Sequence, residues 1–182
     1  MRVIGGKYRG RRLKTVDGLA VRPTSDRLRE TLFNILAPQI KGSRFLDLCA
    51  GSGAVGIEAL SRGATHVTLV DQSRRACAAI QVNLQTIGVT NEATIINKDA
   101  VSALKQLTGK FNVIFFDPPY ESALYDRVLG ELGASELAAS NAIVVVEHRA
   151  KHPPGRTYGL LELFREVKQG ESSLAFFQLA ER

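Results

Sequence analysis

The chain has 182 residues, with 24 Lys and Arg against 18 Asp and Glu, so its formal net charge is +6. This length suits one domain with a full hydrophobic core, and no linker, low-complexity segment or internal repeat divides it. Residues 1–7 lack the apolar stretch of a signal peptide, and the longest apolar runs are far too short to cross a bilayer. We therefore expect one cytoplasmic, monomeric domain without a membrane segment, made of an N-terminal extension (residues 1–40) and a core (residues 41–182).

The positive charge is concentrated at the N-terminus. Residues 1–30, including Arg29, hold nine cations and three anions, whereas the rest of the chain holds 15 of each. Such a local excess suits a phosphate backbone, because Lys and Arg release its condensed counterions. Glycines at positions 5, 6 and 10 indicate a closely packed hairpin rather than a solvated helix. The residues expected to bind nucleic acid are Arg2, Lys7, Tyr8, Arg9, Arg11, Arg12, Arg22, Thr24 and Arg27. For the last three, contact with a cofactor carboxylate is an equal alternative.

Helices and strands are predicted to alternate along the rest of the chain. A first helix begins after an N-cap at Thr24 or Ser25 and is expected to end at Pro38. The alternation that follows is typical of an α/β, Rossmann-like fold with a mostly parallel sheet covered by helices on both faces. A final hairpin is expected to make the last strand antiparallel. The predicted strands are 44–49, 66–70, 93–97, 111–116, 142–147, 160–168 and 173–180, and the later helices are 54–61, 74–87, 101–107 and, in broken form, 124–137.

A glycine turn follows the first predicted strand. The sequence Asp47-Leu48-Cys49-Ala50-Gly51-Ser52-Gly53-Ala54-Val55-Gly56 reads as a strand, a turn and the start of a helix. Glycines at such a turn let the backbone approach a ligand and enter the helix sharply. Cys49 is interpreted as a small residue beside the turn rather than a nucleophile. The cofactor-binding residues predicted here are Asp47, Cys49, Ala50, Gly51 and Gly53.

Acidic residues end the next two strands. Asp71, followed by Gln72, lies twenty residues after Gly51, a spacing that lets a carboxylate accept the ribose hydroxyls of an adenosine nucleoside. This pattern also fits NAD. Asp47 favours S-adenosylmethionine, because a carboxylate at the strand tip opposes a pyrophosphate but suits a cationic amino group. Asp99, followed by Ala100, is expected either to accept the adenine amino group or to serve only as an N-cap.

The tetrapeptide Asp117-Pro118-Pro119-Tyr120 closes the fourth predicted strand. The two prolines fix φ and have no N–H, so the chain must leave the sheet in one restricted conformation. The Asp117 carboxylate and the Pro118 carbonyl can accept the two hydrogens of an exocyclic amino group, and Tyr120 can stack on the ring that carries it. We assign catalysis to these three residues and place Asp117 at the cofactor as well. The alternative is a strand that merely ends in a proline turn.

Two further residues and two cysteines carry weaker signals. Glu147 and His148 follow the fifth predicted strand and border the base pocket or serve a structural role. Cys49 and Cys77 have no CxxC spacing and form no ligand pattern with the histidines. No metal site or disulfide is therefore predicted.

Together these motifs resemble class I S-adenosylmethionine-dependent methyltransferases that act on exocyclic amino groups. The chain is similar to the RsmD family over essentially its whole length, and the stretches 2–11, 22–30 and 46–64 carry the resemblance. The resemblance implies a seven-stranded sheet and methylation of guanine N2 in 16S ribosomal RNA, within the assembled small subunit.

Three other functions stay open on the residues alone. An adenine-N6 methyltransferase of DNA or RNA would use the same tetrapeptide, although the chain has no room for a separate sequence-reading domain. An NAD-dependent enzyme would use the same glycine turn. A non-catalytic ribosome-assembly protein that binds RNA would retain the pocket without turnover.

Overall fold

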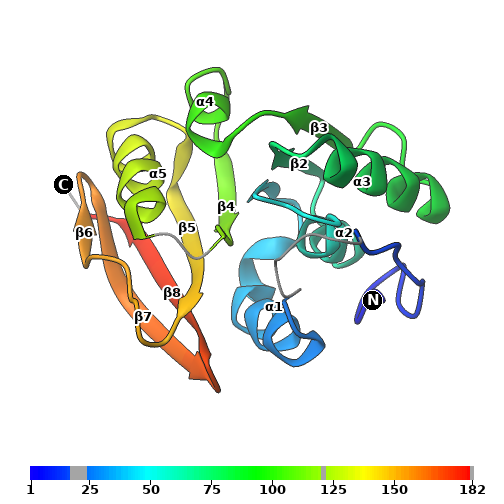
Figure 1. Ribbon diagram of the computed structural model, residues 1–182, viewed down its shortest axis with the longest axis horizontal. Coiled ribbons are helices and arrows are strands. Elements are labelled where there is room, and N and C mark those ends of the chain that lie inside the picture. The colour runs from blue at the N-terminus through cyan, green and yellow to red at the C-terminus, as the bar shows by residue number, and fades with distance from the viewer. Residues whose placement is uncertain (17–23, 120–121, 181–182) are drawn as a thin grey trace.

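The framework of the molecule is one mixed eight-stranded sheet. The computed structural model describes residues 1–16, 24–119 and 122–180. The strand order is β3-β2-β1-β4-β5-β8-β7-β6, with the first five parallel and the last three joined antiparallel (Figure 1). The strands are β1 (Arg44–Leu48), β2 (His66–Asp71), β3 (Ala93–Asn97), β4 (Phe111–Phe116), β5 (Ala138–Arg149), β6 (Thr157–Tyr158), β7 (Leu161–Gln169) and β8 (Ser172–Leu179). The predicted α/β fold is confirmed, and β6 is a short strand added at the edge.

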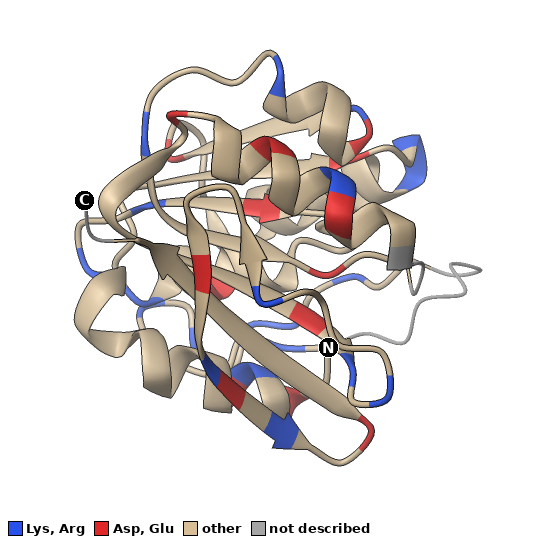
Figure 2. Cartoon of the chain, turned by 90° about the vertical axis from the view of Figure 1, so that its left-hand side faces the viewer, with Lys and Arg blue, Asp and Glu red and all other residues tan. Residues whose placement is uncertain are grey.

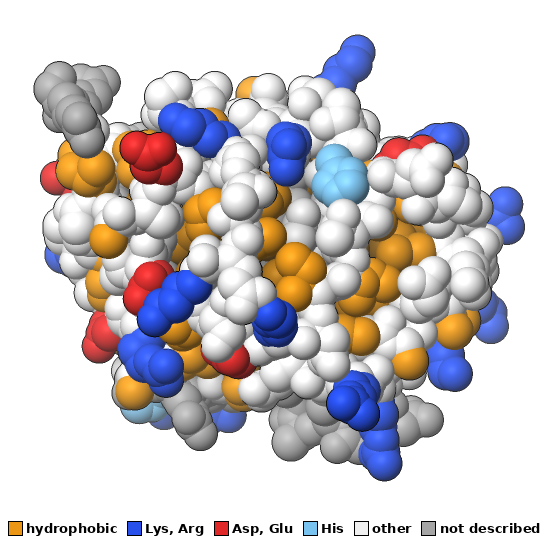
Figure 3. Space-filling model, turned by 90° about the horizontal axis from the view of Figure 1, so that it is seen from above, with side chains coloured by type: hydrophobic (Ala, Val, Ile, Leu, Met, Phe, Trp, Pro, Cys, Tyr) orange, Lys and Arg blue, Asp and Glu red, His pale blue; other side chains and the backbone are white. Residues whose placement is uncertain are grey.

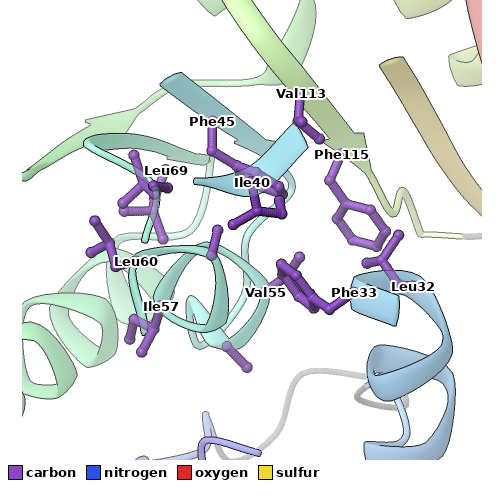
Figure 4. Close-up of a cluster of buried hydrophobic side chains, with 14 of the residues drawn as sticks. Leu32, Phe33, Ile40, Phe45, Val55, Ile57, Leu60, Leu69, Val113 and Phe115 are labelled. Carbon is purple, nitrogen blue, oxygen red and sulfur yellow. The ribbon is translucent and has the colours of Figure 1, made fainter. Parts of the chain in front are cut away.

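Helices cover both faces of the sheet. Neighbouring residues on a strand point to opposite faces, so Phe45 packs in one buried cluster and Leu46 in the other. The Phe45 cluster lies between the sheet and α1 to α3, and Figure 4 shows Phe33 and Ile57 reaching it from α1 and α2. The second cluster holds the apolar side chains of α4 and α5. The helices are α1 (Asp26–Ile40), α2 (Ala54–Ser61), α3 (Arg74–Ile87), α4 (Ala100–Leu104) and α5 (Ser122–Ala134).

Helix α1 passes through the proline that was expected to end it. Ser25 is the N-cap, and its hydroxyl accepts a hydrogen bond from the Leu28 N–H at 3.2 Å. Pro38 lies inside the helix, which continues to Ile40. Pro38 removes one N–H from the last turn, where Asn34 is exposed and its carbonyl can turn to water. The buried Ile40 holds the final turn against the core, so the prediction that Pro38 ends the helix is wrong by two residues.

Strand β5 is longer than predicted at both ends. Its first residues, starting at Ala138, precede an irregularity at which the pairing with β4 shifts. The small and polar residues of this stretch gave no strand pattern in the sequence. At the other end, Arg149 pairs with Ser172 of the antiparallel β8, which extends β5 beyond the predicted 142–147.

The basic N-terminal segment (residues 1–14) folds back on itself and packs on α2 and α3. A single bridge pairs Arg2 with Arg12, and backbone hydrogen bonds join Val3 to Arg11 (2.9 Å) and Met1 to Leu13 (3.0 Å). The predicted hairpin is therefore present, closed by isolated bonds rather than a regular ladder. In Figure 1 it lies beside α2, far from the C-terminal strands.

The opposite end of the sheet carries charges of both signs. Glu162, Arg165, Glu166 and Lys168 all lie on β7 (Figure 2), and among the described residues only the two-residue β6 borders its outer side. Charged side chains discourage pairing of such an edge with another chain. In the described part of the chain, every helix is too short or too polar to cross a membrane.

Candidate functional site

The carboxyl ends of the parallel strands bring the predicted acidic residues together. Leu48 of β1 pairs with Val70 of β2 and with Phe116 of β4. Asp71 and Asp117 come directly after these two partners, so they lie on either side of the β1 tip. Parallel strands end at a common edge, where α/β proteins bind their ligands.

The glycine turn after β1 is tied to the end of β2. The Gly51 N–H donates to Asp71 Oδ2 at 2.8 Å, and the other carboxylate oxygen of Asp71 accepts from the Ser73 N–H at 2.8 Å. Gly51 has a φ of +57°, and a side chain placed on it would meet nothing within 4 Å. The turn therefore faces open space. Gly53 faces the core instead, where an added Cβ would lie 3.1 Å from Ile80 and Leu69.

Asp47 is buried at the floor of this edge. Asp47 is only 1% exposed, and its Oδ2 accepts a hydrogen bond from the Gly56 N–H of α2 at 2.9 Å. Burial raises the pKa of the Asp47 carboxyl to about 7, while the hydrogen bond from Gly56 opposes this shift and the charge of Asp71 adds to it. A positive ligand group at this point would stabilise the ionised form.

Cys49 has an unusual backbone conformation. Its φ of +64° places a residue with a Cβ in the left-handed region, which costs of the order of 1 kcal/mol. Burial raises the pKa of its thiol, and the surrounding carboxylates Asp71 and Asp117 raise it further. A protonated thiol is a poor nucleophile, so Cys49 serves the shape of the turn.

Two pockets open on this edge and meet at Cys49, Gly51 and Asp117. The first lies between the N-terminal segment and the glycine turn, and the second extends across the ends of β2 and β3. We call the two together the cleft. Besides the three shared residues, the first pocket includes Met1, Thr15, Thr24, Asp47, Ala50 and Phe115, and the second includes Asp71, Gln72, Asp99, Ala100, Pro119 and Arg127.

Asp99 has both of its predicted features, an N-cap and a place in the cleft. Its Oδ1 accepts the Ser102 N–H at 3.0 Å as the N-cap of α4. Hydrogen bonds from Ser102 lower the pKa of the Asp99 carboxyl, and the charge of Arg127 contributes a smaller decrease. The N-cap role is thus present, and contact with an adenine remains a prediction.

Asp117 stands where the two pockets meet. The residue is half-buried, Pro118 is buried, and Pro119 is exposed at the rim. Burial raises the pKa of the Asp117 carboxyl well above its ordinary value, and the negative charges of Glu147 and Asp47 raise it further. Tyr120, the predicted stacking residue, lies outside the described residues. Asp117 and Pro119 therefore line the cleft, the buried Pro118 lines neither pocket, and the stacking contact stays a prediction.

A buried carboxylate from β5 lies next to Asp117. Glu147 is 4% exposed, and its Oε2 accepts the Thr24 hydroxyl at 2.8 Å. The Thr24 side chain thus joins the N-terminal extension to this strand, and its expected contact with RNA or a cofactor stays a prediction. His148 is fully buried, with Nδ1 2.9 Å from the Arg149 carbonyl and Nε2 3.3 Å from a Glu166 carboxylate oxygen, which fits the structural role considered for it.

The predicted RNA-binding side chains are mostly on the surface. Arg9, Arg11, Arg12 and Arg27 are exposed, as are Arg2 and Lys7. Tyr8 is partly buried, with the Lys7 ammonium 5.0 Å from the centre of its ring. Arg22 lies outside the described residues. Lys105, Lys110 and Arg127 are also exposed, so positive charge is not limited to the N-terminal segment. Figure 3 shows Lys and Arg side chains among apolar ones on one face of the molecule.

One of the nine N-terminal cations is not available to a partner. The Arg29 side chain is fully buried, and its Nη2 donates to the Arg2 carbonyl at 2.7 Å and to Asp26 Oδ1 at 2.9 Å. The helical face that carries Leu28 and Leu32 also carries Arg29 into the core. Arg29 therefore adds nothing to the basic surface of the N-terminal segment.

Sequence reasoning missed the residues that hold the N-terminal segment in place. Glu58 is fully buried and accepts the Ile4 and Gly5 N–H groups at 2.8 Å each, as well as Arg62 Nε at 2.7 Å. Ser61 accepts the Tyr8 N–H at 2.9 Å. These two polar residues recur at a helical spacing in the otherwise apolar α2, a signal that was present in the sequence. Asn83 of α3 adds bonds to the backbone of Lys14.

Within the described ranges, the structure has no cluster of three or more His, Cys, Asp or Glu residues arranged to hold a metal ion. The positions that could hold a small ligand are the carboxylates and backbone groups around the glycine turn.

Comparison with known proteins finds relatives over nearly the full length of the chain. The family described as conserved hypothetical protein 95 matches residues 1–178. Ribosomal RNA small subunit methyltransferase D of Escherichia coli K12 is 38% identical over 178 residues, covering 98% of this chain and 89% of the relative. A Bacillus subtilis protein with the provisional name rRNA methyltransferase YlbH is 38% identical over 182 residues, covering 98% of both. A solved Escherichia coli protein with a provisional methyltransferase name superposes with a TM-score of 0.88 at 37% identity, covering 100% of this chain and 99% of the other.

Proposed function

The chain belongs to the RsmD family of methyltransferases, described as conserved hypothetical protein 95, and we propose that it methylates guanine N2 in small-subunit ribosomal RNA with S-adenosylmethionine as methyl donor. Support for the target class comes from the E. coli relative, whose name specifies small-subunit rRNA. Support for an amino group as acceptor comes from Asp117, which lines both pockets of the cleft and precedes the carbonyl of Pro118.

The residues of the cleft fit an S-adenosylmethionine molecule. Each Asp71 oxygen accepts one backbone N–H and keeps a further acceptor site for a ribose hydroxyl. Asp47 offers a buried negative charge to the amino group of the methionine part. Gly51 leaves open space above the turn, and we expect Ala50, Gln72, Asp99 and Ala100 to contact the rest of the molecule.

When bound, S-adenosylmethionine supplies a methyl group on a positively charged sulfur, which keeps the electron pair of the broken C–S bond. The chain's task is to orient the acceptor. An aromatic amino nitrogen shares its lone pair with the ring and is a weak nucleophile, so alignment supplies much of the rate. The Pro118 carbonyl and the Asp117 carboxylate accept its two hydrogens, which turns the lone pair toward the methyl group. Asp117 then accepts the proton that the nitrogen loses after the new N–C bond forms.

The observation that carries this proposal is the position of Asp117 between the two pockets. The same carboxylate lines the half that holds Asp71 and the half that holds Asp47. A base that enters beside Pro119 therefore meets the acceptor groups and the methyl donor at one point. Extruding a base costs a few kcal/mol and less in a loop than in a duplex, which favours a loop guanine as the target.

The test offers three substrates to the purified protein with labelled S-adenosylmethionine: naked 16S rRNA, small-subunit particles and duplex DNA. We expect methyl transfer to the particles, with N2-methylguanosine as the product in nucleoside mass spectrometry. Asp117→Asn, which keeps the side-chain shape but removes the charge, is the matched control and should transfer almost nothing.

Other outcomes of this experiment would redirect the assignment. N6-methyladenosine as product would move the target to adenine. Tight particle binding without any transfer by the wild-type protein would indicate an assembly factor. Saturable binding of NAD but not of S-adenosylmethionine would overturn the methyl donor.

A further inference from the structure

The Thr24 hydroxyl lies beside two carboxyl groups, that of the half-buried Asp117 in the cleft and that of the buried Glu147. Thr24 Oγ1 donates to Glu147 Oε2 at 2.8 Å. It lines the same pocket as Asp117, and a hydrogen bond from it lowers the pKa of the Asp117 carboxyl. The three residues come from different places: Thr24 precedes α1, Asp117 follows β4 and Glu147 lies on β5. Since Phe116 pairs with Val146, the two acids follow paired residues on neighbouring strands.

A hydroxyl group has one proton to donate. If the proton of Thr24 goes to Glu147, the bond to Asp117 must run the other way, from a protonated Asp117 to the Thr24 oxygen. The order Asp117–H···Thr24–H···Glu147 is then a continuous hydrogen-bonded chain. Its reverse places the proton on Glu147 and leaves Asp117 ionised.

The charges around these three hydrogen-bonded residues favour a single proton shared by Asp117 and Glu147. Burial raises the pKa of Glu147 as it does that of Asp117, and hydrogen bonds from Thr24 and Ser172 only partly oppose the shift. Asp117 also faces Asp47 at the end of β1, whose charge acts in the same direction. Two neighbouring buried acids disfavour double ionisation, so a proton on one allows the other to remain charged.

We propose that Thr24 and Glu147 form a proton relay behind Asp117, through which the proton taken from the substrate amino group leaves the reaction centre. This inference rests on the proposed function and adds two residues to it. Both act through Asp117 and are positioning residues for the base.

The proton count of the relay is balanced. Before transfer the single proton of the pair is on Glu147, and the Thr24 hydroxyl donates to the ionised Asp117. The substrate nitrogen loses one proton to an Asp117 carboxylate oxygen, and the electrons of the N–H bond stay on nitrogen. Once Glu147 has released its proton to water and the Thr24 hydroxyl has turned to it, Asp117 passes its proton to the Thr24 oxygen as the original Thr24 proton moves to Glu147. Asp117 is then again a carboxylate, Thr24 a hydroxyl and Glu147 an acid.

The relay also gives the N-terminal extension a part in the chemistry. Thr24 belongs to the segment that continues into α1, whereas both acids belong to the sheet. Its hydroxyl therefore completes the proton path only while the extension is packed against β5. No cofactor contact needs to be assigned to Thr24 for this role.

The decisive experiment compares Thr24→Val with Thr24→Ser in single-turnover methyl transfer at saturating cofactor and substrate. Valine keeps the branched shape of threonine but has no hydroxyl, whereas serine keeps the hydroxyl. We expect Thr24→Val to slow transfer about 10- to 100-fold, toward the lower end of what proton transfer by a side chain contributes. Thr24→Ser should restore most of the rate. Dissociation constants for S-adenosylmethionine and for the particle should match wild type in both.

Glu147→Gln tests the far end of the relay through the pH profile. Glutamine keeps the acceptor oxygen for Thr24 but cannot take a proton. The charge of Glu147 raises the pKa of Asp117, so its removal should move the acid limb of the rate profile to lower pH while the plateau rate falls. A purely structural role would lower the rate without moving the limb.

Each result decides for or against the relay. A Thr24→Val rate and pH profile equal to wild type would refute it while methyl transfer itself stands. Loss of cofactor affinity in Thr24→Val, with Thr24→Ser normal, would make Thr24 a cofactor contact and also refute the relay. If Glu147→Gln does not fold, the comparison of Thr24→Val with Thr24→Ser still decides, because neither substitution removes a charge. Absence of transfer by wild type would instead refute the proposed function.

Discussion

Two pairs of acids at this edge of the sheet are held in different ways. Asp71 accepts hydrogen bonds from the N–H groups of Gly51 and Ser73, and Asp99 accepts one from the N–H of Ser102. Asp117 is half-buried where the two pockets meet, beside the buried Glu147, which accepts the Thr24 hydroxyl. Backbone donors favour the ionised carboxylate, whereas burial among other acids disfavours it. The first arrangement suits a fixed acceptor for hydroxyl and amino groups, and the second suits a group that gains and loses a proton.

Among the variants that test this comparison, Asp117→Ala should have the largest effect on methyl transfer. The variant removes the proton acceptor, so we expect the methyl-transfer rate to fall by about 10²- to 10⁴-fold. Cofactor affinity, measured by calorimetry, should remain nearly intact because Asp71 and Asp47 are untouched. Equal losses of affinity in this variant and in Asp71→Ala would contradict the division of roles.

Asp71→Ala should affect the opposite property. It removes acceptors for the ribose hydroxyls and the anchor of the Gly51 N–H, so cofactor affinity should fall about 10- to 100-fold, as expected for the loss of one or two hydrogen bonds to a charged group. The rate at saturating cofactor should remain close to wild type. Single-turnover kinetics over a range of cofactor concentrations separates the two quantities, and a rate that stays low at saturation would place Asp71 in the chemical step.

Asp47 allows a test through stability and pH. Burial raises the pKa of its carboxyl to about 7, so between its unfolded value and this value the folded form binds more protons than the unfolded form. The stability of the ligand-free protein should therefore decrease as pH rises through this window. Asp47→Asn, which keeps an acceptor for Gly56, should remove part of this decrease and stabilise the protein by about 1–3 kcal/mol above pH 8. Thermal unfolding at pH 5.5 and 8.5 measures it, and an unchanged slope would refute the assignment.

Asp99 should give the smallest effect. Asp99→Ala removes the N-cap of α4 and should cost about 1 kcal/mol of stability, whereas Asp99→Asn keeps a good N-cap. Denaturant unfolding compares the two. If Asp99→Asn weakens cofactor binding while stability is retained, the carboxylate contacts the cofactor in addition to capping the helix.

Most of the fold could be predicted from the sequence because its strands and helices follow strong local patterns. The strand 111–116 and the helices 54–61 and 74–87 were predicted with their observed bounds. The predicted end of α1 at Pro38 was wrong. The rule that proline ends a helix overestimated the cost of one lost hydrogen bond, because the buried Ile40 holds the last turn against the core. The start of β5 was missed because residues 138–141 pair only through a shifted register that no local pattern reveals.

The site was predictable where one strand end carries the residue, and less so where several segments meet. Asp47, Asp71 and Asp117 could be placed from the rule that parallel strands end at one edge. The contact between Thr24 and Glu147 joins residues 123 positions apart, and no spacing in the sequence signals it. Burial of Arg29 also depends on tertiary packing, since the same residue type is exposed at positions 9, 11 and 12.

The bonds that hold the N-terminal segment impose an order on folding during synthesis. The basic segment leaves the ribosome first, yet its partners Glu58, Ser61 and Asn83 follow 53 to 69 residues later in the chain. Such distant contacts cannot form until those residues have emerged and α2 and α3 have folded. The hairpin thus acquires its final place only after α3 has emerged, and until then its arginines belong to a nascent chain beside ribosomal RNA.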